Sequence, residues 1–532
     1  MWQKIKNIKF VNIVWFLFYV LIFLLLLRGG LSYLDPDFGW HLKAGEEAWI
    51  NKTAPYQNYY NFTYTGTWVN HEWLSDLLLY LAYENLGYDF LVIFFALIIT
   101  LTLVLLNIFV FRNLLSKPGF GLIIIFQLLG VLAAMPHFGI RIQEIALLFV
   151  FLLLLILENY NKYRNWPVLL WLPVLFILWA NLHASFLLGL VLMFAWPAFK
   201  LLEKILAIIL NKSKSLPWLD LSKQITWPQL KLFSLFSFIA LLATLFNPYG
   251  FKLFSFLGGY QNKAYLSLIQ EWLPQHSFPL YYLQLIYLSL GLVALLLYIY
   301  KRYRLKVGLD LWTVFLNITF LFLSWQSRRH FPLFLVVSFI LIVETYSDFF
   351  SDLKIIYVSW LKKITIFCFL LVISSQLILI RFIENPFASF CQTYPCSAKN
   401  FLQENPEYLN YDIFNNYTWG GFLIWTMPEK KIFIDGRLPQ VEFADKTFVE
   451  EYYEFFKKET DYQQKLEQYN IKLVLINSQD KVINLKKWEK IFFNIDDEDV
   501  KISNYLRDYL AASENWQLIY QDSVAQIYFT ND

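Results

Sequence analysis

The sequence predicts a polytopic α-helical membrane protein with a C-terminal extracytoplasmic α/β domain. Three observations predict this class. Hydrophobic residues make up 58% of the 532 residues, charged residues make up only 16%, and the mean hydropathy is +0.45, which is unlike a soluble globular protein. Apolar runs of membrane-spanning length recur along the first 384 residues. Beyond residue 385 charged residues become frequent and the apolar runs shorten to strand length.

About eleven apolar runs can cross a hydrocarbon core of roughly 30 Å. They lie at residues 11–28, 89–111, 120–136, 142–158, 167–182, 186–210, 232–247, 281–300, 309–325, 331–348 and 364–382. Lysines and arginines gather in alternate loops, which the positive-inside rule assigns to the cytoplasm together with the N-terminus. We therefore expect a multi-pass protein of the plasma (inner) membrane, with a cytoplasmic N-terminus and an extracytoplasmic tail.

Two domains follow from this pattern. Residues 1–384 form a transmembrane module whose first outer loop (29–75) is acidic, and residues 385–532 form the soluble domain. In the tail, the pattern predicts strands at 411–414, 420–425, 431–435, 472–478, 516–521 and 524–529, and helices near 446–457, 461–469 and 499–512. Alternating strands and helices indicate an α/β layer.

Other features of the chain limit its functions. The net charge of +3 is spread between apolar spans and forms no continuous basic patch, so nucleic acid is not an expected partner. Cys391 and Cys396 would permit a short disulfide in an oxidising compartment. Asp435 and Arg437, at the end of a predicted strand, are more typical of a structural ion pair than of a site.

The strongest functional signal is the acidic first outer loop. Asp35 and Asp37 straddle Pro36 directly after the first span, and His71-Glu72 precedes the second. Ionisable groups at a membrane edge are functional-site candidates by default. Pro36 disfavours a helical conformation at the residue before it, so the carboxylates should project from the helix end. The many Trp and Tyr residues of the loop have a simpler explanation, since such side chains anchor membrane interfaces.

Motifs along nearly the whole chain accompany this loop. They are Asp35-Pro36-Asp37-Phe38-Gly39-Trp40-His41, His71-Glu72-Trp73, Arg141 with Gln143, Trp179-Ala180-Asn181-Leu182-His183, Asn247-Pro248-Tyr249-Gly250, Glu271-Trp272, Arg328-Arg329, Trp419-Gly420-Gly421 and Phe433-Ile434-Asp435-Gly436-Arg437. This set resembles membrane glycosyltransferases of the GT-C superfamily, and more particularly a bacterial and archaeal group of that type. The resemblance implies transfer of a sugar from a polyprenyl-phosphate carrier to a glycan, lipid or protein acceptor on the outer side, with inversion.

The chemistry that this resemblance implies needs a base and a cationic site for the departing lipid phosphate. The catalytic candidates are Asp35, Asp37, His71 and Glu72, and the candidates for binding the donor phosphate are Arg141, Arg328, Arg329, Lys43 and His183. Simpler roles are that the arginines reach lipid headgroups and that His183 forms a hydrogen bond between helices.

Two questions about the site stay open. Superfamily protein mannosyltransferases pair Asp directly with Glu in this loop, whereas here Pro36 separates the acids, so either Asp35 or Asp37 can be the base; Asp37 is slightly favoured. No cofactor is assigned with certainty. His71 and Glu72, with one of the aspartates, have the ligand types of a divalent metal site, and metal dependence is undecided.

An alternative class is a transporter or lipid flippase without glycosyl transfer. Such proteins also need many spans and a polar cavity, and membrane lipids are partners in either case. They commonly contain internal repeats with broken helices at the membrane midplane. We see no corresponding halves, and the charges gather at one face instead of mid-span. An assembly protein that docks through its tail would leave the acidic loop unexplained, so the sequence favours an enzyme.

Overall fold

The computed structural model describes residues 2–113, 120–211, 225–258, 265–305, 309–350, 359–383, 386–439, 441–443, 446–483, 485–496 and 501–531. The chain divides into two compact units, each taken from three stretches of sequence. Unit 1 is Met1–Leu31, Asp89–Gly250 and Tyr281–Ile383, and unit 2 is Ser32–Tyr88, Phe251–Leu280 and Glu384–Asp532. The first outer loop therefore belongs to the same compact unit as the C-terminal tail.

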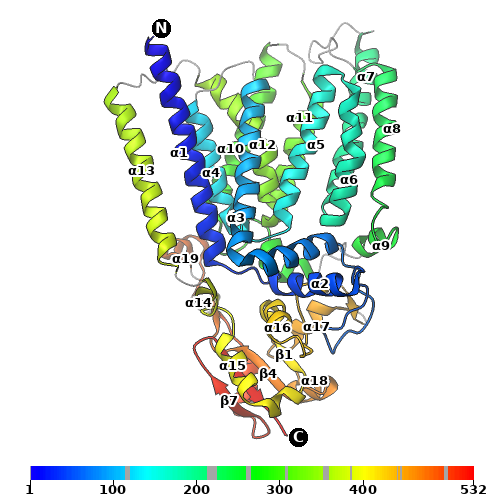
Figure 1. Cartoon of the computed structure of the whole chain (residues 1–532), viewed down its shortest axis with the longest axis vertical. Coiled ribbons are helices and arrows are strands. Elements are labelled where there is room, and N and C mark those ends of the chain that lie inside the picture. The colour runs from blue at the N-terminus through cyan, green and yellow to red at the C-terminus, as the bar shows by residue number, and fades with distance from the viewer. Residues whose placement is uncertain are drawn as a thin grey trace. The chain divides into compact units, whose positions relative to one another are not determined.

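Unit 1 is a bundle of apolar helices that run side by side (Figure 1). Its helices are α1 (Trp2–Ser32), most of α3 (Trp73–Asn113), α4 (Phe120–Ala134), α5 (Gln143–Tyr163), α6 (Trp171–Leu182), α7 (Phe186–Asn211), α8 (Trp227–Ala243), α10 (Tyr282–Leu305), α11 (Leu311–Gln326), α12 (Phe331–Phe349) and α13 (Ser359–Arg381). Among the described residues, eight helices are long and apolar enough to cross a membrane, and three more apolar helices are shorter. Every predicted span lies on one of these helices, which confirms the polytopic class.

Helix α3 is broken at Gly87. Its backbone there has φ 79° and ψ 177°, a conformation that residues with a Cβ rarely adopt. The boundary between the two units falls directly after this break, between Tyr88 and Asp89. The part beyond the break corresponds to the span predicted at 89–111, and the part before it belongs to unit 2.

Helix α12 forms the centre of unit 1. Of its membrane-spanning segment, 72% is buried within the protein, compared with 11% for α13. It packs against α4, α10 and α11. A Cβ on Gly130 would lie 2.2 Å from the Leu335 side chain, and one on Gly291 would lie 2.4 Å from the Phe334 ring. Glycines at these positions therefore let the helices approach closely, as is common in membrane bundles.

Unit 2 contains a four-stranded sheet and short helices. The strand order is β1 (Ile413–Asn415), β4 (Leu473–Asn477), β8 (Ala525–Phe529) and β7 (Gln517–Gln521), with only β1 and β4 parallel. The other elements are α2 (Phe38–Asn51), α9 (Lys252–Gly258), α14 (Pro386–Phe390), α15 (Cys396–Glu404), α16 (Gly420–Thr426), β2 (Glu442–Phe443), β3 (Lys446–Thr447), α17 (Phe448–Glu454), α18 (Tyr462–Gln468), β5 (Lys481–Val482), α19 (Lys487–Phe493), β6 (Lys501–Ile502) and α20 (Tyr505–Ala512). This mixture of strands and helices confirms the predicted α/β character of the tail.

Two predicted strands of the tail are wrong. Residues 420–425 form helix α16, because a short apolar run fits either structure and its packing decides between them. Helix α16 packs closely on α2, and a Cβ added to Gly39 would lie 2.1 Å from the carbonyl oxygen of Gly421. The run at 431–435, also predicted as a strand, makes only isolated bridges.

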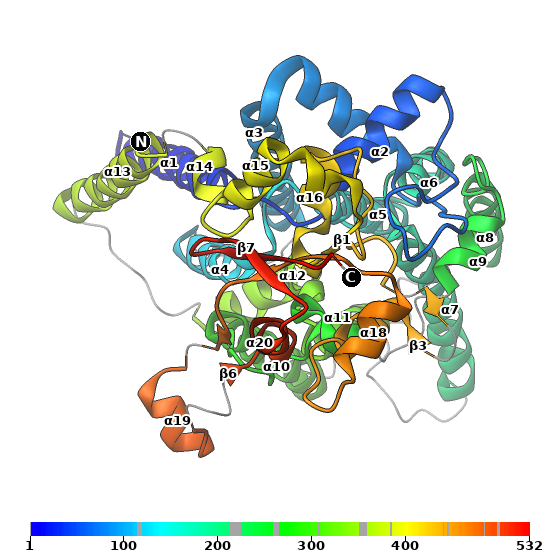
Figure 2. The ribbon, with the colours of Figure 1, turned by 90° about the horizontal axis from the view of Figure 1, so that it is seen from below.

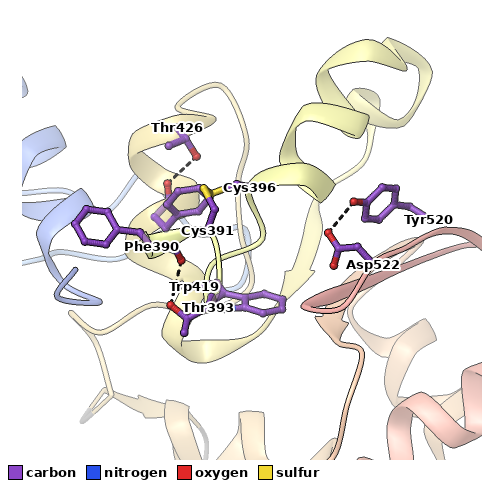
Figure 3. Close-up of a disulfide and its surroundings, with 9 residues drawn as sticks. Phe390, Cys391, Thr393, Cys396, Trp419, Thr426, Tyr520 and Asp522 are labelled. Atoms are coloured by element: carbon purple, nitrogen blue, oxygen red, sulfur yellow. Dashed lines mark hydrogen bonds between the residues drawn. A yellow bond between two sulfur atoms is a disulfide. The ribbon is translucent and has the colours of Figure 1, made fainter. Parts of the chain in front are cut away.

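The disulfide that the sequence permits between Cys391 and Cys396 is present (Figure 3). It closes the turn between α14 and α15. The indole Nε1 of Trp419 donates to the carbonyl oxygen of Thr393 inside this turn, at 3.0 Å. The disulfide therefore fixes a turn that lies against the start of α16, the helix on which α2 packs.

Candidate functional site

Asp35 and Asp37 lie at the beginning of α2. The Oδ1 atom of Asp35 accepts from the backbone N–H of Asp37 at 2.9 Å. Asp37 occupies the N-cap position of α2 but makes no capping hydrogen bond with its side chain. Its Oδ1 atom instead accepts from Nε1 of Trp40 at 2.9 Å. A Cβ on Gly436 would lie 2.1 Å from the same oxygen, so the Asp37 carboxylate lies against the backbone of the tail.

The Asp37 carboxylate is partly buried and has an altered acidity. Burial, and after it repulsion from Asp35, raises the pKa of Asp37 to about 6. His41 and the indole hydrogen bond lower this pKa, and Glu271 raises it further. The carboxylate is thus mostly ionised at neutral pH, and it becomes protonated as the pH falls below about 6. This acidity suits a general base that works near neutral pH.

The next residue of the group is the buried His41, whose charge acts on Asp37. His41 Nδ1 is 2.6 Å from Oδ1 of Asp76, whose other oxygen accepts from Nδ2 of Asn70 at 2.6 Å. The Nε2 atom of His41 is 3.9 Å from a Glu72 oxygen. Burial lowers the pKa of His41, but the carboxylates of Asp76, Glu72 and Asp37 outweigh this effect and raise it to about 9. His41 therefore carries a positive charge at neutral pH, which favours the ionised form of Asp37.

Two further predicted catalytic residues, His71 and Glu72, belong to this same group. Glu72 is buried, and its Oε1 atom is 3.7 Å from Nε2 of His71. The backbone N–H of Glu72 donates to the side chain of Asn70, which also binds Asp76. Unit 2 therefore brings together all four predicted catalytic residues, with Glu72 placed beside His41.

The pair Asp435 and Arg437 joins the tail to the first outer loop. The guanidinium donates to both Asp435 oxygens at 2.8 Å, and both side chains are 0% exposed. Its Nη2 atom also donates to the side-chain oxygens of Asn58 and Asn61, each at 2.9 Å. This geometry confirms the interpretation of the pair as a structural ion pair, and it fixes the tail loop that carries Gly436.

Sequence reasoning missed two side chains near Asp37. Glu271, in the short 3-10 helix Gln270–Trp272, contributes to the raised pKa of Asp37 but was not among the candidate site residues. Tyr417 comes from the tail, and burial, followed by the charge of Asp37, raises its pKa well above the usual value. Both residues lie in or beside the motifs quoted above, but their spacing from the first outer loop gave no sign of proximity.

The phosphate-binding candidates are divided between the units. Lys43 is on α2 in unit 2, and its Nζ atom is 2.6 Å from a Glu46 oxygen. His183 is in unit 1 at the C-terminal end of α6, where its Nδ1 atom is 2.8 Å from Oγ of Ser185 and accepts from the Ser185 backbone at 3.0 Å. These contacts occur within each residue's own turn or helix.

The arginine candidates lie in unit 1. Arg328 is 0% exposed, in the 3-10 helix Arg328–His330, and its guanidinium is 4.5 Å from the centre of the Tyr281 ring. A side chain that reached out to lipid headgroups would not be enclosed by protein in this way. Arg141, just before α5, and Arg329 are partly buried. Arg328 is therefore the candidate for which the headgroup interpretation fits least.

Metal binding was also left open by the sequence. In the part of the chain that the structure describes, no three or more His, Cys, Asp or Glu side chains are grouped so that they could hold a metal ion. The acids and histidines of unit 2 are bound to one another and to amides instead, as in the contacts of His41 and Asp76. No step below is assigned to a metal.

No protein-family model and no curated protein matches the chain. Among solved structures, the chain is similar to the archaeal oligosaccharyltransferase AglB from Archaeoglobus fulgidus in complex with an inhibitory peptide and a dolichol-phosphate. The identity is 12% and the TM-score 0.48, over 86% of this chain and 69% of that chain. For the A. fulgidus oligosaccharyltransferase tethered with an acceptor peptide containing the NVT sequon, the identity is 12% and the TM-score 0.49, over 97% and 74%. Both of these solved structures are of an archaeal oligosaccharyltransferase.

Proposed function

We propose that this protein is a membrane glycosyltransferase of the hexosyltransferase type. It moves a sugar from a polyprenyl-phosphate-linked donor to an acceptor on the extracytoplasmic side, with inversion at the anomeric carbon. The observation that carries this proposal is the partly buried Asp37 carboxylate, whose pKa is raised to about 6 and which makes no capping hydrogen bond to α2. An acid with these properties beside a charged histidine is more typical of a general base than of a structural contact.

The proposed reaction is a single displacement. Asp37 takes the proton of the acceptor hydroxyl while the hydroxyl oxygen forms its bond to the anomeric carbon. The bond between that carbon and the phosphate oxygen breaks, and the electron pair leaves with the polyprenyl phosphate. Because the acceptor attacks the face opposite the leaving group, the anomeric configuration inverts. Asp35 is the second candidate for the base.

The neighbours of Asp37 are assigned positioning roles. Glu72 and Asp76 hold the His41 imidazolium, and its charge favours the ionised form of Asp37. His71 supports Glu72 from the other side. Through these contacts the group keeps Asp37 ionised at neutral pH despite its burial and the repulsion from Asp35.

The departing phosphate needs a cationic partner. We assign this role to Arg328, Arg329 and Arg141, assisted by Lys43 and His183, because a guanidinium forms two parallel hydrogen bonds to phosphate oxygens.

Product analysis in reconstituted vesicles tests the proposed function. The purified chain is mixed with radiolabelled polyprenyl-phosphate glucose or mannose and with glycans, peptides and membrane lipids as acceptors. We expect a new glycosidic product of inverted configuration, with and without a metal chelator. Movement of the donor between leaflets without any such product would instead assign the chain to the transporters. Activity lost on chelation and restored by Mg²⁺ or Mn²⁺ would show that transfer depends on a divalent metal.

Replacing Gly436 with Ala is expected to lower transfer by about 10²-fold, because the added Cβ would displace the Asp37 carboxylate from its place. The matched control is Gly258→Ala in the same unit, where a Cβ would have no neighbour within 4 Å. Initial rates of product formation measure both variants. Equal rates for Gly436→Ala and Gly258→Ala would show that the position of this carboxylate does not matter for transfer.

A further inference from the structure

Helix α19 (Lys487–Phe493) presents an apolar face outward. Trp488, Ile491 and Phe492 are spaced i, i+3 and i+4 and so share one side of the helix. They are 49%, 82% and 76% exposed. Glu489, on another side, is only 3% exposed, and its carboxylate accepts from the backbone N–H of Lys486. A surface helix in water shows the reverse arrangement, with its apolar side chains turned inward.

We call Trp488, Ile491 and Phe492 the α19 face. Figure 2 shows α19 at the edge of unit 2, apart from α20 and β7. Because these three side chains are exposed, the described part of the chain leaves this face largely uncovered. Exposed aromatic and branched side chains that gather in one place mark a surface that binds another apolar phase.

One contact of α19 is made with a residue that lies close in sequence to the start of a membrane span. The ring of Phe493 packs edge-on against that of Phe278, with centroids 5.2 Å apart and planes at 79°. Phe278 lies four residues before Tyr282, where the membrane-spanning helix α10 begins. Four extended residues reach at most ~14 Å. The α19 face is thus tied by a short length of chain to the end of a membrane span.

We propose that the α19 face inserts into the interfacial layer of the membrane that α10 crosses and thereby fastens the tail to the bilayer. Trp and Phe are the side chains preferred at this depth. Lys486 and Lys487 are exposed beside the face and can extend toward the headgroups. The acidic residues from Asp496 onward balance these lysines, so burial of apolar surface, and not attraction to anionic lipid, drives the insertion. This inference is independent of the proposed function.

Spin labelling of the full chain tests the proposal. In a Cys368→Ala background, which removes the exposed free thiol, Phe492→Cys is labelled in nanodiscs of phosphatidylcholine with one copy per disc. Collision rates with oxygen, which concentrates in lipid, and with a water-soluble nickel chelate report its surroundings. The control is Leu518→Cys on β7, which is 43% exposed in the same unit.

At position 492 we expect collisions with oxygen to exceed those with nickel severalfold, and at position 518 the reverse. Three results at position 492 would overturn the proposal. The label could behave like the control, or it could be protected from both reagents as if covered by protein. It could also insert only when anionic lipid is added. As a second variant, Ile491→Ser with Phe492→Ser is combined with a label at Trp488→Cys. This pair of polar residues is expected to move the label from the oxygen pattern to the nickel pattern, and an unchanged pattern would count against the proposal.

Discussion

Asp37→Asn is expected to reduce sugar transfer by roughly 10²–10⁴-fold, the usual contribution of a general base. The amide has the shape of the carboxylate, and its oxygen can still accept the Trp40 hydrogen bond of 2.9 Å. What it loses is the ability to take a proton from the acceptor. The substitution therefore removes the proposed base while it keeps the local hydrogen bond to Trp40. Initial rates of product formation by the purified variant, in the vesicles described above, measure the effect.

The stability of this variant gives a second result. Because the folded protein raises the pKa of Asp37, the ionised carboxylate costs stability at neutral pH, and its removal relieves repulsion from Asp35 and Glu271. The thermal unfolding midpoint of Asp37→Asn is expected to hold or rise. Asp412→Asn, at an exposed position of the same unit, is the control and should keep full transfer. If Asp37→Asn also kept full transfer, the base would have to be another group.

Arg437→Met is expected to lower the free energy of unfolding by about 3–5 kcal/mol. The substitution leaves the Asp435 carboxylate inside unit 2 with no opposing charge, and it removes the hydrogen bonds to Asn58 and Asn61. The guanidinium also lies 4.6 Å from the centre of the Trp68 ring. Denaturant unfolding followed by tryptophan fluorescence measures the loss.

Two comparisons isolate the buried pair. Removing both charges, in Asp435→Leu with Arg437→Met, is expected to recover part of the loss, because no isolated charge remains buried. Lys457→Met breaks an ion pair of 2.7 Å to Glu454 that is largely open to solvent, and it should cost less than about 1 kcal/mol. A cost for Arg437→Met no greater than that for Lys457→Met would contradict the structural role of the pair.

The sequence predicted the membrane helices well because most of them are long apolar runs whose length identifies them. The short elements were harder. Residues 420–425 have the composition of a strand, and only the close contact between Gly39 and Gly421 shows why they are helical. Helix α2 was taken as part of a loop, since its apolar and charged residues follow no simple membrane pattern.

The residues of the candidate site also divide into those that the sequence could predict and those that it could not. Asp35 and Asp37 could be predicted because they are close in sequence and flank a proline at a helix end. The contact between the first outer loop and the tail could not be predicted, because the hydrogen bond from Asn61 to Asp435 joins residues 374 positions apart in the sequence. For the same reason Glu271 was not among the candidate site residues. Proximity of this kind depends on tertiary packing and has no local signature.

The pH dependence of transfer tests most directly whether Asp37 is the base. Since the base must be deprotonated, transfer should rise with pH through an apparent pKa near 6. Repulsion from Asp35 is the second largest cause of that value, so Asp35→Asn, whose side-chain oxygen can still accept from the Asp37 backbone, should move the acid limb to lower pH. An acid limb that stays in place, or a complete absence of transfer in Asp35→Asn, would contradict the assignment of the base to Asp37.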